Sequence, residues 1–166
     1  GPRKVARRVA GSGIAAAALK YVGVFRSQAV SAVVTTAGEL GRAAVQLHGD
    51  EDRQYVSQLR DALPAGVQIW KAFSIRDSLP QRDWPHVDRY VFDHGNGGSG
   101  QSFDWSLLQG KTLNNVLLAG GLSADNCVEA SRLGCPGLDF NSGVESAPGI
   151  KDADKSASVL QTLEAY

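Results

Sequence analysis

Apolar, strand-like segments recur along this chain at a nearly constant spacing. They begin near residues 21, 43, 67, 89, 115 and 137, so 22 to 26 residues separate each start from the next. This spacing is typical of a strand followed by a helix. Continuous apolar strands between amphipathic helices indicate a parallel sheet that is covered on both faces. The sequence therefore predicts an α/β fold built from six βα units.

The expected strands cover residues 21–25, 43–48, 67–73, 89–92, 115–119 and 137–141. Helices are expected over residues 3–10, 28–40, 51–63, 123–133 and 152–164, with a short one from about Asp104; Ser27 and Ser123 are expected to cap two of them. A closed eight-stranded barrel typically needs roughly 200 to 250 residues. The 166 residues are therefore expected to form a single, incomplete TIM (βα)8 barrel domain that lacks the first strand, the first helix and the second strand.

Composition excludes several classes of partner. Lys plus Arg equals Asp plus Glu at 17 each, so the overall charge does not attract nucleic acid or an anionic membrane. No apolar run approaches the ~18 residues of a membrane-spanning helix, and no signal peptide opens the chain. Cys127 and Cys135 form no metal or disulfide motif and are expected to be reduced thiols. These features predict a cytoplasmic protein.

The stretch from Tyr90 to Trp105 contains the strongest catalytic candidate. Three apolar residues run directly into Asp93, and a glycine-rich loop follows over residues 95–100. Asp93 is therefore expected at the carboxyl end of a buried strand, the edge where α/β proteins usually perform chemistry. The alternative is a solvated aspartate at a strand end.

The same loop matches the G-x-G-x-x-G pattern of dinucleotide-binding proteins, but its context does not. That fingerprint needs the first glycine directly after the strand and an acidic residue about 20 residues further on. Here Asp93 would repel a pyrophosphate, and the next strand ends in Gly120 and Gly121 without a carboxylate. The pattern alone does not indicate a dinucleotide site.

Two small-residue loops, 119–123 and 141–145, follow the last two expected strands. In barrels, the loops after strands seven and eight commonly bind phosphate through backbone N–H groups. Gly120, Gly121, Ser142 and Gly143 are therefore the candidate phosphate-binding residues. Tight turns that need glycine at positive φ are the alternative explanation.

Several motifs together resemble one family, phosphoribosylanthranilate isomerase, from Pro2 to Tyr166. They are Val45–Gly49, the Asp93 loop with Phe103–Trp105, Leu118–Leu122, Asp139–Ser146 and Pro148–Asp152. The residues within these motifs are similar to those of the enterobacterial form, in which this domain follows indole-3-glycerol-phosphate synthase in one chain. The resemblance implies an Amadori rearrangement of a sugar phosphate in tryptophan biosynthesis, without metal or organic cofactor.

The resemblance also implies roles for individual residues. Asp93 is the general acid, for which its pKa should lie above the ordinary value of about 3.9. Arg3 is the arginine that pairs with the anthranilate carboxylate, Gln46 and His48 line the pocket, and Asp139 lies near the ribose. Structural roles remain open for His48 and Asp139, because both could simply be hydrogen-bonded at the sheet edge.

One departure from the family limits what the resemblance implies. The family's general base is a cysteine in a Lys-Val/Ile-Cys-Gly context, and this sequence lacks that motif. Cys127 is expected inside a helix and Cys135 at the opposite end of the sheet from Asp93, so neither replaces the base. The chain is therefore expected to have little activity alone. Another phosphate-binding α/β enzyme and a non-catalytic sugar-phosphate-binding domain are the alternatives.

Overall fold

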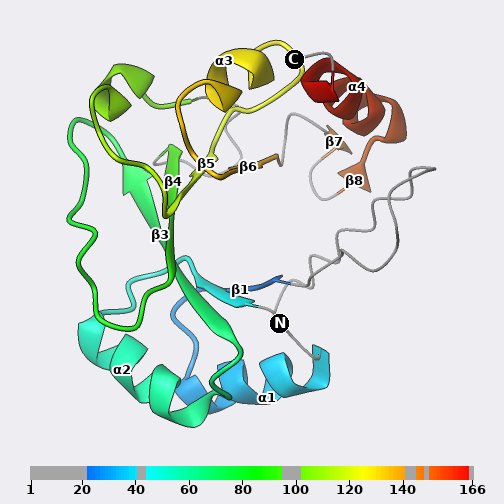
Figure 1. The fold of residues 1–166 in the computed structure, drawn as a ribbon. Coiled ribbons are helices and arrows are strands. Elements are labelled where there is room, and N and C mark those ends of the chain that lie inside the picture. The colour runs from blue at the N-terminus through cyan, green and yellow to red at the C-terminus, as the bar shows by residue number, and fades with distance from the viewer. Residues whose placement is uncertain (1–21, 41–43, 95–101, 141–144, 148–149, 165–166) are drawn as a thin grey trace. The chain divides into compact units, whose positions relative to one another are not determined.

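A computed structural model describes residues 22–40, 44–94, 102–140, 145–147 and 150–164. The chain divides into two compact units, one of Gly1–Ala72 with Arg82–Arg89 and the other of Phe73–Gln81 with Tyr90–Tyr166. The division falls inside a strand, so that strand contributes residues to both units. Figure 1 shows the elements of each unit.

Six strands form one sheet, and their order in the sheet is their order in the sequence. Strand β1 pairs in parallel with β2 and β2 with β3, and β4 pairs in parallel with β5 and β5 with β6. Their bounds are β1 Val22–Phe25, β2 Ala44–Leu47, β3 Gln68–Ile75, β4 Arg89–His94, β5 Val116–Ala119 and β6 Gly137–Asp139. Sequential order with parallel pairing is the topology of a barrel rather than of a doubly wound sheet.

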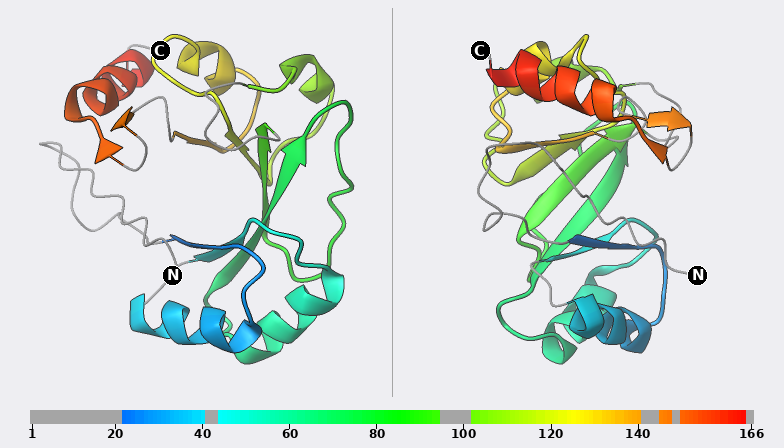
Figure 2. Two further views of the ribbon diagram at one scale, coloured as in Figure 1. Left: turned by 180° about the vertical axis from the view of Figure 1, so that it is seen from behind. Right: turned by 90° about the vertical axis from the view of Figure 1, so that its right-hand side faces the viewer.

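In the first unit, helices α1 (Val30–Leu40) and α2 (Arg53–Ala62) cover one face of the strands (Figures 1 and 2). Alternate strand residues point to that face, because side-chain direction alternates along a strand. Phe25, Val45, Leu47 and Ile69 therefore pack with Val33, Ala37, Val56 and Leu59 of the two helices in one buried cluster. Burying such a side chain stabilises the fold by about 1.5–3 kcal/mol.

Helix α2 begins and ends for identifiable reasons. The Asp52 carboxylate accepts a hydrogen bond from the Tyr55 N–H at 2.8 Å, which satisfies one of the free donors of the first turn. At the other end, Arg60 donates a hydrogen bond to the Val67 carbonyl at 2.7 Å. The helix ends before Pro64, because proline has no backbone N–H with which to continue it. The predicted helix over 51–63 is confirmed to within two residues at each end.

The second unit carries shorter elements after each strand. A 3₁₀ helix, η2 (Trp105–Leu108), is capped by Asp104, and α3 covers only Cys127–Ser131. A two-stranded antiparallel ribbon of β7 (Glu145–Ala147) and β8 (Ile150–Lys151) precedes α4 (Ala153–Glu164). Asp152 accepts a hydrogen bond from the Lys155 N–H at 2.9 Å and so begins α4.

Three local predictions are wrong. Ser27 does not cap α1; its φ is +50° and its hydroxyl accepts a hydrogen bond from the Asp50 N–H instead. Ser123 does not cap a helix over 123–133, because residues 124–126 form a turn and α3 starts at Cys127. The loop expected before the last helix contains the β7–β8 ribbon. The expected opening helix over 3–10 lies outside the described residues.

Candidate functional site

The candidate acid, Asp93, is the penultimate residue of β4, at the carboxyl end of that strand. The preceding residues, Tyr90, Val91 and Phe92, are at most 1% exposed, whereas Asp93 is partly exposed. A buried apolar strand thus presents one carboxyl group at its end. The predicted position of Asp93 is confirmed, although β4 continues through His94 and does not end before Asp93.

The Asp93 carboxyl lies directly against Gly120, which follows the neighbouring strand β5. A methyl group added at the Gly120 Cα would overlap Asp93 Oδ1 and would lie 2.8 Å from the His94 backbone nitrogen. Only glycine leaves room for such a close approach. The candidate acid and the first candidate phosphate-binding loop are therefore in contact within one compact unit.

Backbone conformation fixes the shape of this loop. Gly120 has φ +85° and Gly121 has φ +67°, both in the left-handed region that favours glycine. The Asn126 side chain makes two hydrogen bonds to this loop. Its Nδ2 donates to the Gly121 carbonyl at 2.8 Å, and its Oδ1 accepts from the Ser123 N–H at 2.9 Å. The positive φ values fit a tight turn and a phosphate cradle alike, so the phosphate role remains a prediction.

Asp139 is the last residue of β6 and lies at the same edge of the sheet. Its backbone is in register with Ala119, the residue before Gly120. The structure thus brings Asp93, Gly120 and Asp139 to the carboxyl ends of three consecutive strands. Ser142 and Gly143, the other candidate phosphate-binding residues, lie outside the described residues, as does Arg3.

Gln46 and His48 belong to the first unit. Gln46 is in β2 and only 5% exposed, and His48 follows that strand. The His48 N–H donates to the Phe25 carbonyl at 2.7 Å, which fixes the backbone there against β1. Since Val45 and Leu47 point to the helices, the alternation of side chains places Gln46 on the opposite face of the sheet, and His48 with it.

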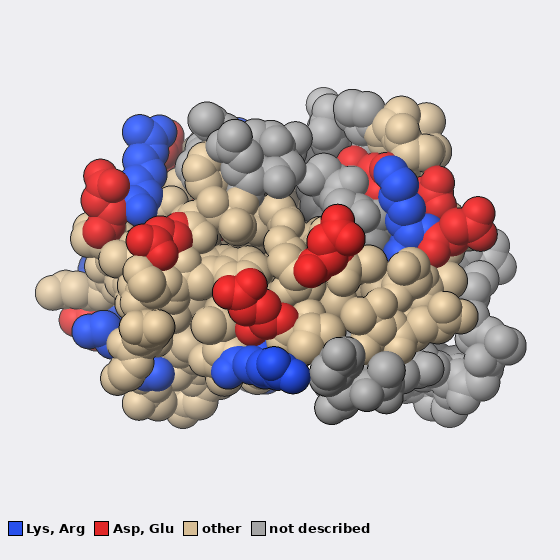
Figure 3. Space-filling model, turned by 90° about the horizontal axis from the view of Figure 1, so that it is seen from above, with Lys and Arg blue, Asp and Glu red and all other residues tan. Residues whose placement is uncertain are grey.

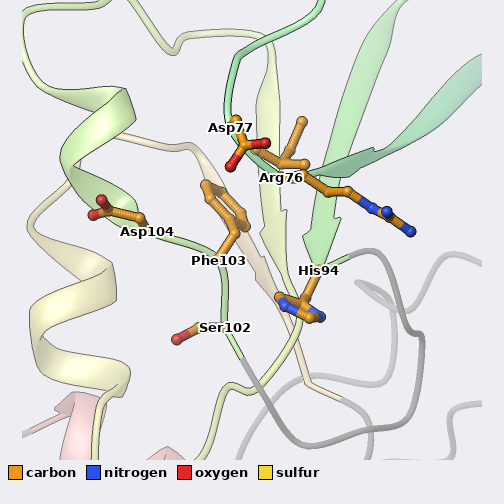
Figure 4. A pocket seen from close by; sticks show the side chains of 7 residues that line it. Arg76, Asp77, His94, Ser102, Phe103 and Asp104 are labelled. Atoms are coloured by element: carbon orange, nitrogen blue, oxygen red, sulfur yellow. The ribbon is translucent and has the colours of Figure 1, made fainter.

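A pocket of about 350 Å³ lies in the second unit, beside the ends of β3 and β4 (Figure 4). Figure 4 shows the Phe103 ring between Asp77 and His94. The residues that line the pocket are Ile75, Arg76, Asp77, His94, Ser102, Phe103 and Asp104. Successive residues of a strand point to opposite faces, so the side of β4 that carries His94 is not the side that carries Asp93. This pocket is therefore distinct from the edge that carries Asp93, Gly120 and Asp139.

Three groups have perturbed pKa values, and each cause is local. Hydrogen bonds from Ser106 lower the pKa of Asp104, and a hydrogen bond from Arg53 lowers that of Asp83. Burial, and secondarily the Glu51 charge, raises the pKa of Tyr55 above its ordinary 10.0. None of the three belongs to the edge that carries Asp93.

Sequence reasoning missed Asn126, Glu51 and Lys71. Glu51 and Lys71 form a buried ion pair with an Nζ–Oε1 distance of 3.3 Å. A lysine inside the apolar segment 67–73 was the available signal, because a charged residue is almost never fully buried without a partner. Asn126 gave no comparable signal, since it reads as one more polar residue in a predicted helix.

The two cysteines lie in different parts of the second unit. Cys127 is buried at the start of α3, and Cys135 precedes the amino end of β6, the end opposite to Asp139. The expected places of both cysteines are confirmed, and that neither replaces the base stays a prediction. Among the described residues, no group of His, Cys, Asp and Glu is arranged to hold a metal ion.

Charge is mixed on the face of the molecule shown in Figure 3, where Lys and Arg side chains lie close to Asp and Glu side chains. The helices in the described ranges are also too short or too polar to cross a membrane.

Sequential parallel strands, an acidic group at their carboxyl edge and an adjoining glycine loop define a barrel-type α/β enzyme. Comparison with known proteins agrees and is more specific. The chain belongs to the N-(5'phosphoribosyl)anthranilate (PRA) isomerase family, which it matches over residues 1–162.

Individual relatives are similar over most of this chain. "Tryptophan biosynthesis protein TrpCF" of Salmonella typhi is 61% identical over 165 residues, which are 99% of this chain and 36% of that protein. The chain thus spans about a third of the length of the curated relatives it matches. The phosphoribosyl anthranilate isomerase of Thermus thermophilus is 31% identical with a TM-score of 0.73, covering 87% of this chain and 72% of that one.

A third comparison concerns the fold alone. A phosphoribosyl anthranilate isomerase in complex with reduced 1-(o-carboxyphenylamino)-1-deoxyribulose 5-phosphate is 24% identical, with a TM-score of 0.69, and covers 89% of this chain and 73% of that one. Together with the strand order, these comparisons confirm the predicted barrel-type α/β fold, of which this chain carries six strands. The predicted six βα units are not complete, because β4 follows β3 without a helix between them.

Proposed function

We propose that the domain to which this chain belongs carries out the isomerase step of tryptophan biosynthesis, the Amadori rearrangement of N-(5-phosphoribosyl)anthranilate to 1-(2-carboxyphenylamino)-1-deoxyribulose 5-phosphate. Because this sequence lacks the family's general-base cysteine motif, the chain alone has little activity in this proposal. One observation carries the proposal: the Asp93 carboxyl lies against Gly120, at the start of a glycine loop suited to an anion. A proton donor beside a phosphate loop at the edge of parallel strands is what a sugar-phosphate isomerase requires.

The proposed chemistry needs one acid and one base. Asp93 donates a proton to the furanose ring oxygen; the C1–O bond breaks and an imine forms between C1 and the anthranilate nitrogen. A base then removes the proton from C2, and the electron pair flows through the C2–C1 bond onto that nitrogen. The resulting enol becomes the ketose when the C2 hydroxyl loses its proton and C1 takes one up. The imine nitrogen accepts the electrons, so the proposal involves no metal or organic cofactor.

Other residues bind the substrate in this proposal. Gly120, Gly121, Ser142 and Gly143 donate backbone N–H groups to the phosphate. Gln46 and His48 line the pocket, Asp139 contacts the ribose, and Arg3 pairs with the anthranilate carboxylate through two parallel hydrogen bonds. Cys127 begins α3 and Cys135 precedes the amino end of β6, so this proposal assigns the base to neither of them.

The setting of this activity is also part of the proposal. Both compact units belong to one barrel domain, and in the natural protein an indole-3-glycerol-phosphate synthase domain precedes it. We place the protein in the cytoplasm, where reduced Cys127 and Cys135 are expected. The likeness to TrpCF proteins over nearly the whole chain supports this arrangement.

Replacement of Asp93 tests the proposal. Asp93→Asn keeps the shape of the side chain beside Gly120 and removes the proton donor, so isomerase turnover by the natural full-length protein should fall ~10²–10⁴-fold. Calorimetry with reduced 1-(o-carboxyphenylamino)-1-deoxyribulose 5-phosphate should still detect binding. Binding without turnover by the unaltered protein would favour a non-catalytic sugar-phosphate-binding domain, and no binding at all would refute both functions.

A further inference from the structure

The Glu51 side chain is buried between the loops that follow β1 and β2. Its Oε2 accepts a hydrogen bond from the Ser27 N–H at 2.9 Å, and its Oε1 accepts one from the Gly49 N–H at 2.7 Å. Ser27 follows β1 and Gly49 follows β2, so one carboxylate joins two loops that are 22 residues apart in sequence. Hydrogen bonds to an ionised acceptor are about twice as strong as neutral ones.

Lys71 of β3 neutralises this carboxylate inside the protein. Its Nζ lies 3.3 Å from Glu51 Oε1 and donates to the Gly49 carbonyl at 2.7 Å. The side chains of Lys71 and Glu51 are only 3% and 1% exposed. Lys71 Nζ also lies 5.9 Å from the centre of the Trp84 ring, and Arg53 lies over that ring at 5.1 Å. The aromatic ring thus covers the pair without a competing negative charge.

Further contacts hold the same two loops together. The Asp50 N–H donates to Ser27 Oγ at 3.0 Å, and the Tyr55 hydroxyl donates to the Gln28 carbonyl at 2.7 Å. Ser27 keeps a φ of +50°, which is unfavourable for a residue other than glycine. A methyl group at Gly49 would overlap Ser27 Oγ and would lie 2.6 Å from the Ser27 nitrogen. Because the two loops pack this closely, they can adopt only one arrangement relative to each other.

The ion pair lies on the helix side of the sheet. Lys71 is two residues from Ile69, which packs in the buried cluster with α1 and α2, so both side chains point to that face. Gln46 and His48 point to the other face. Glu51 therefore cannot touch a substrate bound beside His48, but it binds the backbone of Gly49, the residue next to His48.

We propose that Glu51 is a positioning residue for the substrate side of this sheet. Its carboxylate, neutralised by Lys71 and covered by Trp84, fixes the loops after β1 and β2 and thereby the backbone that presents His48. The inference rests on the proposed function, in which His48 lines the pocket. A buried ion pair adds little net stability compared with apolar residues, so its use here is the orientation of the two loops.

Three variants of the natural full-length protein test this role. Glu51→Gln keeps the size of the side chain but replaces one acceptor by an NH₂ group that faces an N–H donor. Glu51→Gln with Lys71→Met also removes the unpaired lysine charge, and this double variant is expected to fold where the single variant is destabilised. Asp61→Asn is the matched control, because it makes the same carboxylate-to-amide change at an exposed position of α2.

We expect both Glu51 variants to lower kcat/KM about tenfold or more, the size of effect that misplacing a binding group produces. Binding of reduced 1-(o-carboxyphenylamino)-1-deoxyribulose 5-phosphate should weaken in parallel. Amide hydrogen exchange at Ser27, His48 and Gly49 should accelerate about tenfold. Asp61→Asn should change none of these quantities by more than about twofold.

Two results would overturn the inference. In the first, the folded double variant turns over substrate and binds the analogue within twofold of the unaltered protein. In the second, its His48 amide exchanges at the original rate, which would show that Glu51 does not hold this backbone. If the unaltered protein neither binds the analogue nor turns over, the proposed function is wrong, and His48 exchange alone then decides the positioning role.

Discussion

At the scale of single residues, Gly120 is the position on which the candidate site depends most. Its φ of +85° and its contact with the Asp93 carboxyl are separate reasons for glycine. A side chain at φ above zero costs roughly 1–2 kcal/mol, and the overlap with Asp93 comes in addition. The two effects can be separated because Gly134 has φ +90° with no atom within 4 Å of an added methyl group.

Gly120→Ala should therefore impair function more than Gly134→Ala does. Both variants should lose roughly 1–2 kcal/mol of unfolding free energy to backbone strain, measured by urea denaturation. Only Gly120→Ala should also displace Asp93 and reduce isomerase turnover, since a 1 Å misplacement can cost about 10²-fold. Equal turnover in the two variants would show that the Asp93–Gly120 contact has no functional importance.

Asn126 is the second residue whose role can be measured directly. Each of its two hydrogen bonds to the 121–123 loop contributes about 0.5–1.5 kcal/mol. Asn126→Ala removes both and should weaken binding of the phosphate-bearing product analogue. Asn126→Asp keeps the acceptor for the Ser123 N–H, but it puts a carboxylate oxygen against the Gly121 carbonyl and adds a negative charge near the proposed phosphate. Calorimetry should therefore rank the unaltered protein above both variants; the loop does not bind phosphate if all three have the same affinity.

At the scale of elements, Tyr55 connects α2 to the loop after β1. Its hydroxyl donates to the Gln28 carbonyl, and burial raises its pKa above 10.0. Because the folded pKa is raised, the stabilising contribution is complete below pH 10 and is lost as the pH rises through the higher folded pKa. Tyr55→Phe should cost about 0.5–1.5 kcal/mol at neutral pH.

That cost should disappear in alkali. Urea denaturation of the two proteins from pH 7 to 11 should give a difference that is constant up to about pH 10 and then shrinks. The exposed Gln54→Ala on the same helix is the control and should show no such dependence. A Tyr55→Phe difference that stays constant across the whole range would mean that the hydroxyl is not the titrating group.

The elements also show what the sequence could predict. All six strands were predicted within about two residues, because each is a mostly apolar run, such as Val116–Ala119, that is bounded by turn or loop residues. Helix caps were less predictable. Ser27 and Ser123 both have side chains suited to capping. The Ser27 hydroxyl accepts instead from the Asp50 N–H of another loop, whereas the Ser123 hydroxyl accepts from the Asp125 N–H in a local turn that ends before α3.

Residues of the candidate site could be predicted where they lie at the end of a strand. Contacts between residues of different loops and strands could not be predicted from the sequence. Asp93 and Asp139 end β4 and β6, so a strand prediction alone places them at one edge. The Glu51–Lys71 pair depends on the pairing of β2 with β3, which no local pattern specifies. The β7–β8 ribbon was missed for a similar reason, because its strands are only three and two residues long.

At the scale of the whole molecule, the balance of charge governs solubility. With 17 basic and 17 acidic residues and an isoelectric point near 7.0, the chain has no net repulsion between copies at neutral pH. Proteins associate and precipitate most readily where net charge is near zero. Its solubility in ammonium sulfate should therefore be lowest near pH 7 and should rise on both sides of that value.

Two added carboxylates should move this minimum. Ser57 and Gln58 are exposed on α2, so Ser57→Glu with Gln58→Glu changes the net charge to about −2 without touching the core. The minimum should shift below pH 7, and solubility at pH 7 should increase, whereas Ser57→Thr with Gln58→Asn should leave both unchanged. If the charged and neutral variants precipitate alike at pH 7, apolar contacts rather than net charge limit solubility. The expected shift follows because two added carboxylates bring the net charge to zero at a pH below 7.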